Sequence, residues 1–252
     1  MAVTIKSPRE IELMRKAGEI LAKTHEELHA ALRPGMSTLD IDRLGEKIIR
    51  SHGCIPSFKN YNGYPASICV SVNDEVVHGI PNRHRILKEG DIVSLDAGVI
   101  YKGYHSDAAR TWAVGQVSPE AQKLMDVTKQ CFFEGIRFAK EGCRLQDISA
   151  AIQSYAESHG CSIVREYVGH GVGAEMHEAP EIPNYGHPGR GPRLLRGMTL
   201  AIEPMVNAGS AAIRLMPDGW TVRTMDGKWA AHYENTVLIT DGEPEILTAP
   251  AI

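Results

Sequence analysis

Apolar residues recur at helical spacing in two stretches near the start of the chain. The recurring positions of the first stretch are Ile11, Met14, Ile20, Leu21, His25 and Leu28. Ser7, Pro8 and Glu10 form a helix start, with an N-cap serine, a proline at the first helical position and an acid at the third. A proline and a glycine at 34–35 end this helix, and a second helix runs from residue 37 or 38 to about residue 53.

The pattern changes to a period of two between residues 93 and 112, which predicts a strand that folds back as a hairpin. Alternate residues from 93 to 99 are apolar, so Asp96 points away from the apolar face. A turn at 101–103 then brings Asp107 beside Asp96. The two aspartates lie directly opposite if the turn is centred between residues 101 and 102. They are diagonal neighbours, about 7–8 Å apart at Cα, if it is centred on 102–103.

The pattern of helices and hairpin occurs twice in the chain. With a shift of 107 residues, 31–54 falls without gaps on 138–161 and seven positions are identical. The same shift places Asp96 on Glu203, and the apolar positions beside them coincide as well. A repeat that carries an acid at the same place in each copy indicates a duplicated unit.

The repeat predicts an α+β fold made of two helix, helix, hairpin halves, at about 8–117 and 118–250. A pseudo-twofold axis would relate the halves, with the helices on one side of a central antiparallel sheet. Asp107 has no acid at its shifted position. The nearest acid in a plausible return strand is Glu234, which makes the second hairpin 20 residues longer, with turn residues at 217–219.

A glycine- and proline-rich segment at 169–193 has no counterpart in the first half and carries His170 and His177. We expect it to be largely irregular, and a long segment of this kind is either functional or disordered. It adds an imidazole to the acids, and the resulting candidate set is Asp96, Asp107, His170, Glu203 and Glu234.

Four carboxylates and one imidazole form a hard, oxygen-rich set that suits Mn, Fe, Co or catalytic Zn. Such a set can hold two divalent ions about 3.5–4 Å apart with a bridging water, which becomes a hydroxide near neutral pH and can attack a carbonyl. His78 and His177 would then serve as outer groups that hydrogen-bond a scissile amide or its tetrahedral intermediate. For one aspartate pair taken alone, a solvated hairpin with scattered acids is the alternative interpretation.

Composition and charge narrow the class of protein. The chain has 252 residues and a net charge of −4, so it offers no basic field for nucleic acid or an anionic membrane. Its first residues contain no apolar run, and no later run approaches the roughly 18 apolar residues of a membrane span. We therefore expect a cytoplasmic protein. Five cysteines without C-x-x-C spacing are expected to be reduced thiols.

Several motifs together resemble one known family. They are His170-Gly-Val-Gly, Met176-His177-Glu178, Ala201-Ile202-Glu203-Pro204-Met205, Tyr233-Glu234-Asn235-Thr236, and Asp96 and Asp107 with ten residues between them. Nearly end to end, from residue 5 to residue 248, the chain is similar to type I methionine aminopeptidase, a pita-bread metallopeptidase. The resemblance implies a single catalytic domain over residues 1–252 with the pita-bread fold. It also implies removal of the initiator methionine from nascent chains whose second residue is small.

The resemblance also implies roles for particular residues. The metal ligands would be Asp96, Asp107, His170, Glu203 and Glu234. Glu203 would also shuttle the proton, and His78 and His177 would contact the scissile peptide. The methionine pocket would be lined by Phe58, Tyr61, Tyr64, Cys69, Met176 and Trp220. Two divalent ions per chain (Co, Mn, Fe or Zn) are implied, a monovalent cation is allowed, and we expect a monomer that meets nascent polypeptides at the ribosome.

Three positions depart from the family pattern, and three other classes of protein have to be weighed. Phe58 and Met176 stand where the family has Cys and Phe, and His232 replaces a common Gln. An X-Pro peptidase shares the fold and ligands but usually has a separate N-terminal domain. A non-catalytic binding module of this fold would have lost ligands. A metal-free amidinohydrolase would leave four acids clustered without a cation, at a cost in free energy.

Overall fold

The computed structural model describes residues 3–249. The helices are α1 (Pro8–Ala31), α2 (Thr38–Ser51), η1 (Tyr61–Gly63, a single 3₁₀ turn), α3 (Pro119–Ile136) and α4 (Leu145–Ser158). The strands of the first half are β1 (Ile55–Pro56), β2 (Ile68–Val72), β3 (Glu75–Val77), β4 (Ile92–Tyr101) and β5 (Tyr104–Ala113). Those of the second half are β6 (Ser162–Ile163), β7 (Gly169–Gly171), β8 (Glu178–Ile182), β9 (Thr199–Ile202), β10 (Met205–Asn207), β11 (Ile213–Leu215), β12 (Val222–Thr224), β13 (Ala230–His232), β14 (Asn235–Leu238) and β15 (Glu245–Ile246).

The helix starts follow the predicted caps. The Ser7 side chain accepts a hydrogen bond from the backbone N–H of Glu10, and the Glu10 carboxylate accepts one from the backbone N–H of Ser7. Ser37 and Asp40 form the same reciprocal box at the start of α2. Each box pairs backbone N–H groups that the first turn of a helix leaves without partners. Both predicted helix starts in the first half are confirmed.

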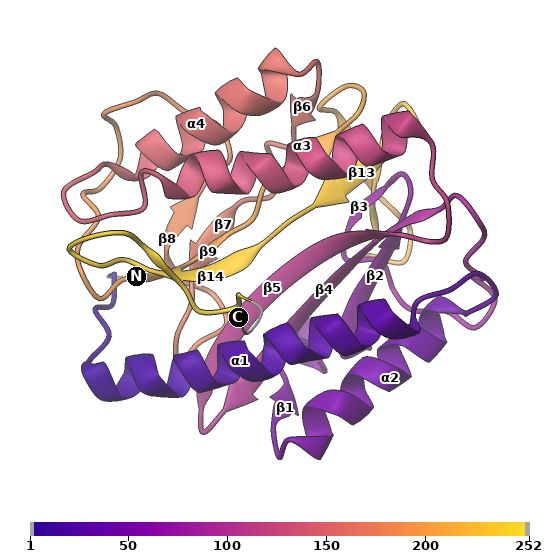
Figure 1. The fold of residues 1–252 in the computed structure, drawn as a ribbon, viewed down its shortest axis with the longest axis horizontal. Helices are drawn as coiled ribbons and strands as arrows, with labels where there is room; N and C mark the ends of the chain where they lie inside the picture. Colours follow the sequence, from indigo (N-terminus) through magenta and orange to yellow (C-terminus); the bar gives the residue numbers. More distant parts are fainter. Residues whose placement is uncertain (1–2, 250–252) are drawn as a thin grey trace.

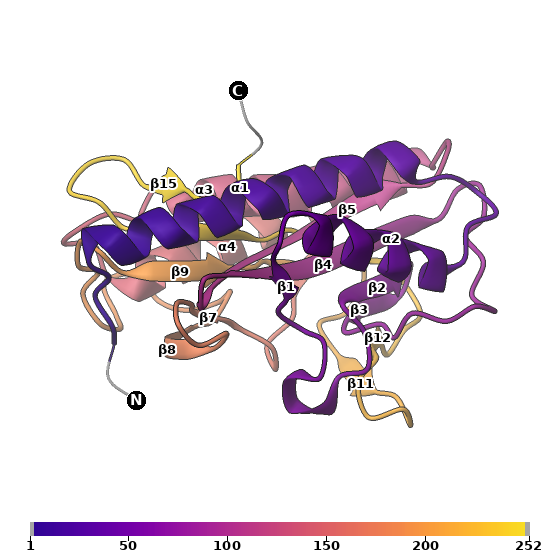
Figure 2. The same cartoon turned by 90° about the horizontal axis from the view of Figure 1, so that it is seen from below.

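The molecule has the predicted layered arrangement. Figure 1 shows α1 and α2 on one side of the central strands and α3 and α4 on the other side in that view. Figure 2 shows that the helices gather along one face of the strand layer, with β8, β11 and β12 on the opposite face. The hydrogen bonds divide the strands into four antiparallel sheets rather than one continuous sheet. Within residues 3–249 there is no helix whose length and apolar character would let it cross a membrane.

The second hairpin is longer than the first, as predicted. β9 pairs with β14, β10 with β13 and β11 with β12. The same antiparallel register continues through all three pairs. The extra residues therefore continue the hairpin outward to a tip at 216–221, where Met216 donates its backbone N–H to the Thr221 carbonyl. The segment at 169–193 contributes β7 and β8, so the expectation of irregular structure holds only for the rest of it.

Helix packing in the two halves follows the repeat but exchanges large and small residues. In the first half, Leu28 on α1 lies against Gly45 on α2, where an added Cβ would be 3.5 Å from the leucine side chain. The 107-residue shift places these positions on Gly135 and Ile152, where a Cβ on the glycine would be 2.8 Å from the isoleucine. The close approach of the helices is thus kept in both halves, because each pair has one residue without a side chain.

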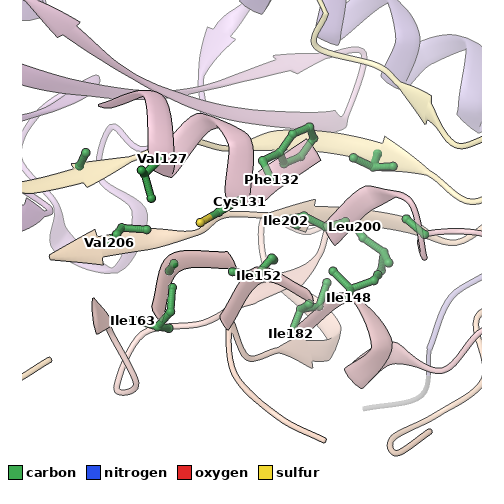
Figure 3. Packing of buried hydrophobic residues seen from close by; sticks show 14 of the residues in the cluster. Val127, Cys131, Phe132, Ile148, Ile152, Ile163, Ile182, Leu200, Ile202 and Val206 are labelled. Carbon is green, nitrogen blue, oxygen red and sulfur yellow. The ribbon is translucent and has the colours of Figure 1, made fainter. Parts of the chain in front are cut away.

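Each helix pair has its own apolar core against the strands. Figure 3 shows the core of the second half, in which Phe132 and Ile152 from the helices face Leu200 and Val206 from the strands. The apolar side of β4 belongs to the core of the first half, under α1 and α2. Because side chains alternate along a strand, Asp96 must project from the face of β4 turned away from these helices.

A buried histidine in this core makes stability depend on pH. His25 on α1 is 3% exposed, and its Nε2 lies 2.9 Å from the Ala108 carbonyl, to which it can only donate. Burial, with a smaller contribution from Arg110, lowers the pKa of His25 to about 3. The unfolded chain takes up a proton near pH 6.5 while the native imidazole stays neutral, so stability falls as the pH drops below 6.5.

We expect the loss of stability at low pH that His25 causes to be absent from His25→Gln, which keeps an N–H donor and does not titrate. Between pH 7.5 and 5.5, the free energy of unfolding of metal-free wild type should fall by about 1 kcal/mol more than that of the variant. Urea denaturation at the two pH values measures the difference. Equal losses in both proteins would mean that native His25 is protonated as readily as in the unfolded chain.

Candidate metal centre

The first hairpin adopts the diagonal register. β4 and β5 pair Asp96 with Ala109 and Gly98 with Asp107, so the two aspartates are two residue pairs apart and lie on the same face. Lys102 and Gly103 form the turn, with φ of 49° and 86° respectively. The register with the aspartates directly opposite is therefore wrong, and the one centred on 102–103 is confirmed.

Hydrogen bonds between β5 and the second hairpin hold Asp107 beside Glu234. The Thr236 hydroxyl accepts from the backbone N–H of Asp107 and donates to its carbonyl, both at 2.9 Å. The backbone N–H of Glu234 donates to the Ala109 carbonyl, also at 2.9 Å. The buried guanidinium of Arg110 donates to the Glu234 carbonyl. The two halves of the chain thus meet through backbone groups immediately beside the acids.

His170 on β7 enters the same site from the unduplicated segment. Its Nδ1 lies 2.9 Å from the Gly171 carbonyl, which can only accept, so Nδ1 carries a proton and Nε2 is the nitrogen that faces the acids. Nε2 is 3.6 Å from Asp107 Oδ2 and 3.6 Å from Glu203 Oε1. One ligand atom from each of Asp107, His170 and Glu234 lies within 4.8 Å of the others, a separation that a metal ion can span.

The electrostatics of the cluster favour a cation. Burial, followed by repulsion from neighbouring carboxylates, raises the pKa of Asp96 and of Glu234 well above the usual range. Burial also raises the pKa of Asp107, although His170 opposes the rise. One carboxylate oxygen of each of these three acids is buried without a hydrogen-bond partner among the described residues. Buried carboxylate oxygens that lack hydrogen-bond donors are suited to divalent ions, so the residues fit a metal site.

One cavity of about 220 Å³ brings together every site residue that the sequence predicts. The metal cluster lies at one part of its wall, with His78 and His177 also lining it. The rest of the wall is largely apolar and comes from Phe58, Tyr61, Tyr64, Cys69, Met176 and Trp220. Tyr64, Cys69 and Met176 are buried, and they pack with Phe58 as a separate apolar cluster. The geometry is therefore a polar cluster opening into an apolar pocket.

The two outer histidines are held in different ways. His78 has a φ of 60°, a left-handed conformation that is uncommon for a residue with a side chain and is often found at functional sites. The residue after His78 is also held, because the Tyr64 hydroxyl donates to the backbone carbonyl of Gly79 at 2.9 Å. His177 Nδ1 lies 2.8 Å from the Tyr61 hydroxyl, and its ring is 4.1 Å from that of His170. Desolvation, followed by repulsion from His170, lowers the pKa of His177 to about 4.

Some contributors to the site carried no clear signal in the sequence. Asn62 lines the cavity from the 3₁₀ turn η1, and only its place between two pocket tyrosines could have indicated it. Thr236 and Arg110 flank predicted ligands, but their hydrogen bonds to the opposite half depend on the tertiary arrangement. His232 was noted as a departure from the family pattern, and it lies buried with its Nε2 3.6 Å from Glu203 Oε2.

Comparisons with known proteins agree with this geometry. Residues 12–241 match metallopeptidase family M24. A methionine aminopeptidase of Clostridium acetobutylicum is 57% identical over 246 residues, which cover 98% of each chain. The crystal structure of methionine aminopeptidase from Thermotoga maritima superposes with a TM-score of 0.96 at 47% identity and covers 98% of this chain and 99% of that one. Xaa-Pro dipeptidase from Bacillus anthracis has a TM-score of 0.80 at 25% identity, and only 62% of its length is covered.

Removing one charge from the cluster should stabilise the metal-free protein. Asp96→Asn eliminates a buried carboxylate whose charged form is disfavoured, so we expect its free energy of unfolding at pH 7 to equal or exceed that of wild type by about 1 kcal/mol. Asp42→Leu is the control, since Asp42 is also buried but accepts from the backbone N–H groups of Ser67 and Ile68 at 2.8 and 2.9 Å, and leucine offers them no acceptor.

The control variant loses an acceptor and should be destabilised by about 1–3 kcal/mol. Thermal and urea unfolding after exhaustive chelation measure both effects. A destabilisation of Asp96→Asn as large as that of Asp42→Leu would identify Asp96 as a structural acid.

Proposed function

The chain belongs to metallopeptidase family M24, and we propose that it removes the N-terminal initiator methionine from nascent proteins whose second residue is small. It is a metallo-aminopeptidase, a hydrolase with the pita-bread fold of its relatives. The X-Pro peptidase alternative fits less well, because the Xaa-Pro dipeptidase is 25% identical to this chain whereas the methionine aminopeptidase of Clostridium acetobutylicum is 57% identical.

The proposal rests on one observation: the acid cluster and the apolar pocket residues line the same cavity. Methionine has an unbranched, polarizable side chain that packs well against aromatic rings and other sulfur-containing residues. The wall opposite the acids supplies Tyr64 and Trp220, whose rings meet edge to face at 5.1 Å. Met176 adds a buried thioether to the same wall. A substrate methionine bound here would present its amino end and first peptide bond to the acids.

We propose that two divalent ions bind at Asp96, Asp107, His170, Glu203 and Glu234. Bound ions of this kind lower the pKa of water and polarise a carbonyl, which is the chemistry that amide hydrolysis requires. The set is oxygen-rich, so Mn, Fe, Co and Zn all suit it. The fixed tautomer of His170 supports its role, since the Gly171 carbonyl directs the free lone pair of Nε2 toward the acids.

The chain's other site residues would bind the substrate and move its protons. Glu203 is the proton carrier in this proposal, because its side chain is 13% exposed whereas that of Asp107 is 4% exposed, so it can reach the reacting groups. His177 faces the cavity beside His170 and, oriented by Tyr61, can hydrogen-bond the scissile carbonyl. His78 lines the same cavity and can hydrogen-bond the amide on the other side.

We further propose that the protein acts in the cytoplasm as a monomer, on chains that emerge from ribosomes. Initiator methionines occur at the ends of newly made chains, so the enzyme has to meet them there. Every ligand of the proposed metal centre comes from one chain, and the cavity is complete without a second copy.

The purified protein with Mn²⁺ or Co²⁺ should cleave Met-Ala-Ser and leave Met-Leu-Ser intact, because a larger second side chain would meet the rim of the cavity. Exhaustive chelation should abolish cleavage, and Asp107→Asn should be inactive at every metal concentration, since it retains the shape and removes one ligand. Chromatographic assay of free methionine measures each case. Full activity after chelation, or preferential cleavage of Ala-Pro, would contradict the proposal.

A further inference from the structure

His232 is a buried side chain that the proposed ligand set does not include. It ends β13 and is 2% exposed. Thr111 on β5 holds its backbone on both sides, because the hydroxyl accepts from the N–H of His232 and donates to its carbonyl, each at 2.9 Å. The imidazole therefore projects from a backbone position that is fixed by the first half of the molecule.

The imidazole stands between the metal centre and a separate cavity. On one side it lines a cavity of about 90 Å³ together with Asp96 and Glu203. On the other side it lines a cavity of about 340 Å³, whose wall includes His29 and Lys129 from α1 and α3. Among the described residues, no other lines both cavities. His232 thus lies between the acids and the outer cavity.

The contact that matters is with Glu203. His232 Nε2 lies 3.6 Å from Glu203 Oε2, and His170 Nε2 lies 3.6 Å from Oε1 of the same carboxylate. Neither ring nitrogen of His232 has a hydrogen-bond partner among the described residues. An N–H directed at Oε2 attracts the carboxylate, whereas a lone pair would repel it. Among the acids that contact an imidazole, Glu203 has the most exposed side chain. Its carboxylate is therefore the least confined by packing, and a second contact restricts its orientation most.

We propose that His232 is a positioning residue that orients Glu203 for the divalent ions, an inference that rests on the function proposed above. Its Nε2 is 3.6 Å from Oε2, close enough for an N–H there to attract that oxygen, while Oε1 faces His170. Groups that orient metal ligands through a second contact commonly change metal affinity by about 10–100-fold when they are removed. Any side chain of similar size with an N–H donor should therefore replace His232, and one without a donor should not.

The test compares His232→Gln with His232→Met, two side chains of similar length and volume that differ in the N–H donor. Calorimetric titration of Mn²⁺ into the metal-free proteins should show affinity within about threefold of wild type for the glutamine variant and about 10–100-fold weaker for the methionine variant. The visible absorption spectrum of the Co²⁺-loaded protein should change in the methionine variant alone. His29→Ala, which alters the outer cavity without touching Glu203, should match wild type in both measurements.

Equal affinities and spectra for the glutamine and methionine variants would overturn the positioning role. If the methionine variant does not fold, His232→Ala takes its place in the comparison, since it also lacks a donor and adds no bulk. Failure of the proposed function is a distinct result, because wild type itself would then bind no divalent ion or release no methionine from Met-Ala-Ser.

Discussion

Repulsion among four carboxylates is the constraint on which the rest of this structure depends. Asp96, Asp107, Glu203 and Glu234 converge on one cavity, and burial followed by repulsion from neighbouring carboxylates disfavours the charged forms of Asp96 and Glu234. Two apolar cores, one beneath each helix pair, supply the free energy that holds the strands in place despite this cost. A fold that places these ligand atoms together is preorganised for a cation, because metal binding then requires little rearrangement.

The duplicated architecture explains how the acids come together. Each half contributes one hairpin with two acids, and neither hairpin alone can surround an ion. The halves meet where Thr236 exchanges hydrogen bonds with the backbone of Asp107 and where Glu234 donates to Ala109. Because these bonds use backbone atoms adjacent to the ligands, any shift between the halves would displace the acids directly. His170 completes the cluster from a segment that belongs to one half only.

Much of the fold and site could be predicted from the sequence because the relevant signals are local. The capping residues Ser7 and Ser37 define the first two helices, and alternation around Asp96 defines the strand. The repeat then relates Asp96 to Glu203, although 107 residues separate them. The register of the first hairpin was left open, because residues 101–103 allow two turn positions and only backbone geometry distinguishes them.

Features that depend on contacts between distant segments could not be predicted. The division into four sheets depends on which strands pair across long stretches of sequence, and no periodicity records this. The left-handed backbone at His78 has no sequence signal, since it is not a glycine. The location of His232 beside the acids depends on β13 lying between α3 and the acids. A departure from a family pattern indicates only that the residue at this position differs. The roles of the site residues remain predictions that the geometry supports.

The most direct test of the account is an anomalous-scattering map from crystals grown with Mn²⁺. The account predicts density for two ions inside the cavity, each in contact with carboxylate oxygens from both hairpins, and with His170 Nε2 bound to one of them. Ions held by a single hairpin, or by residues outside the five, would contradict the claim that the two halves jointly form one metal centre.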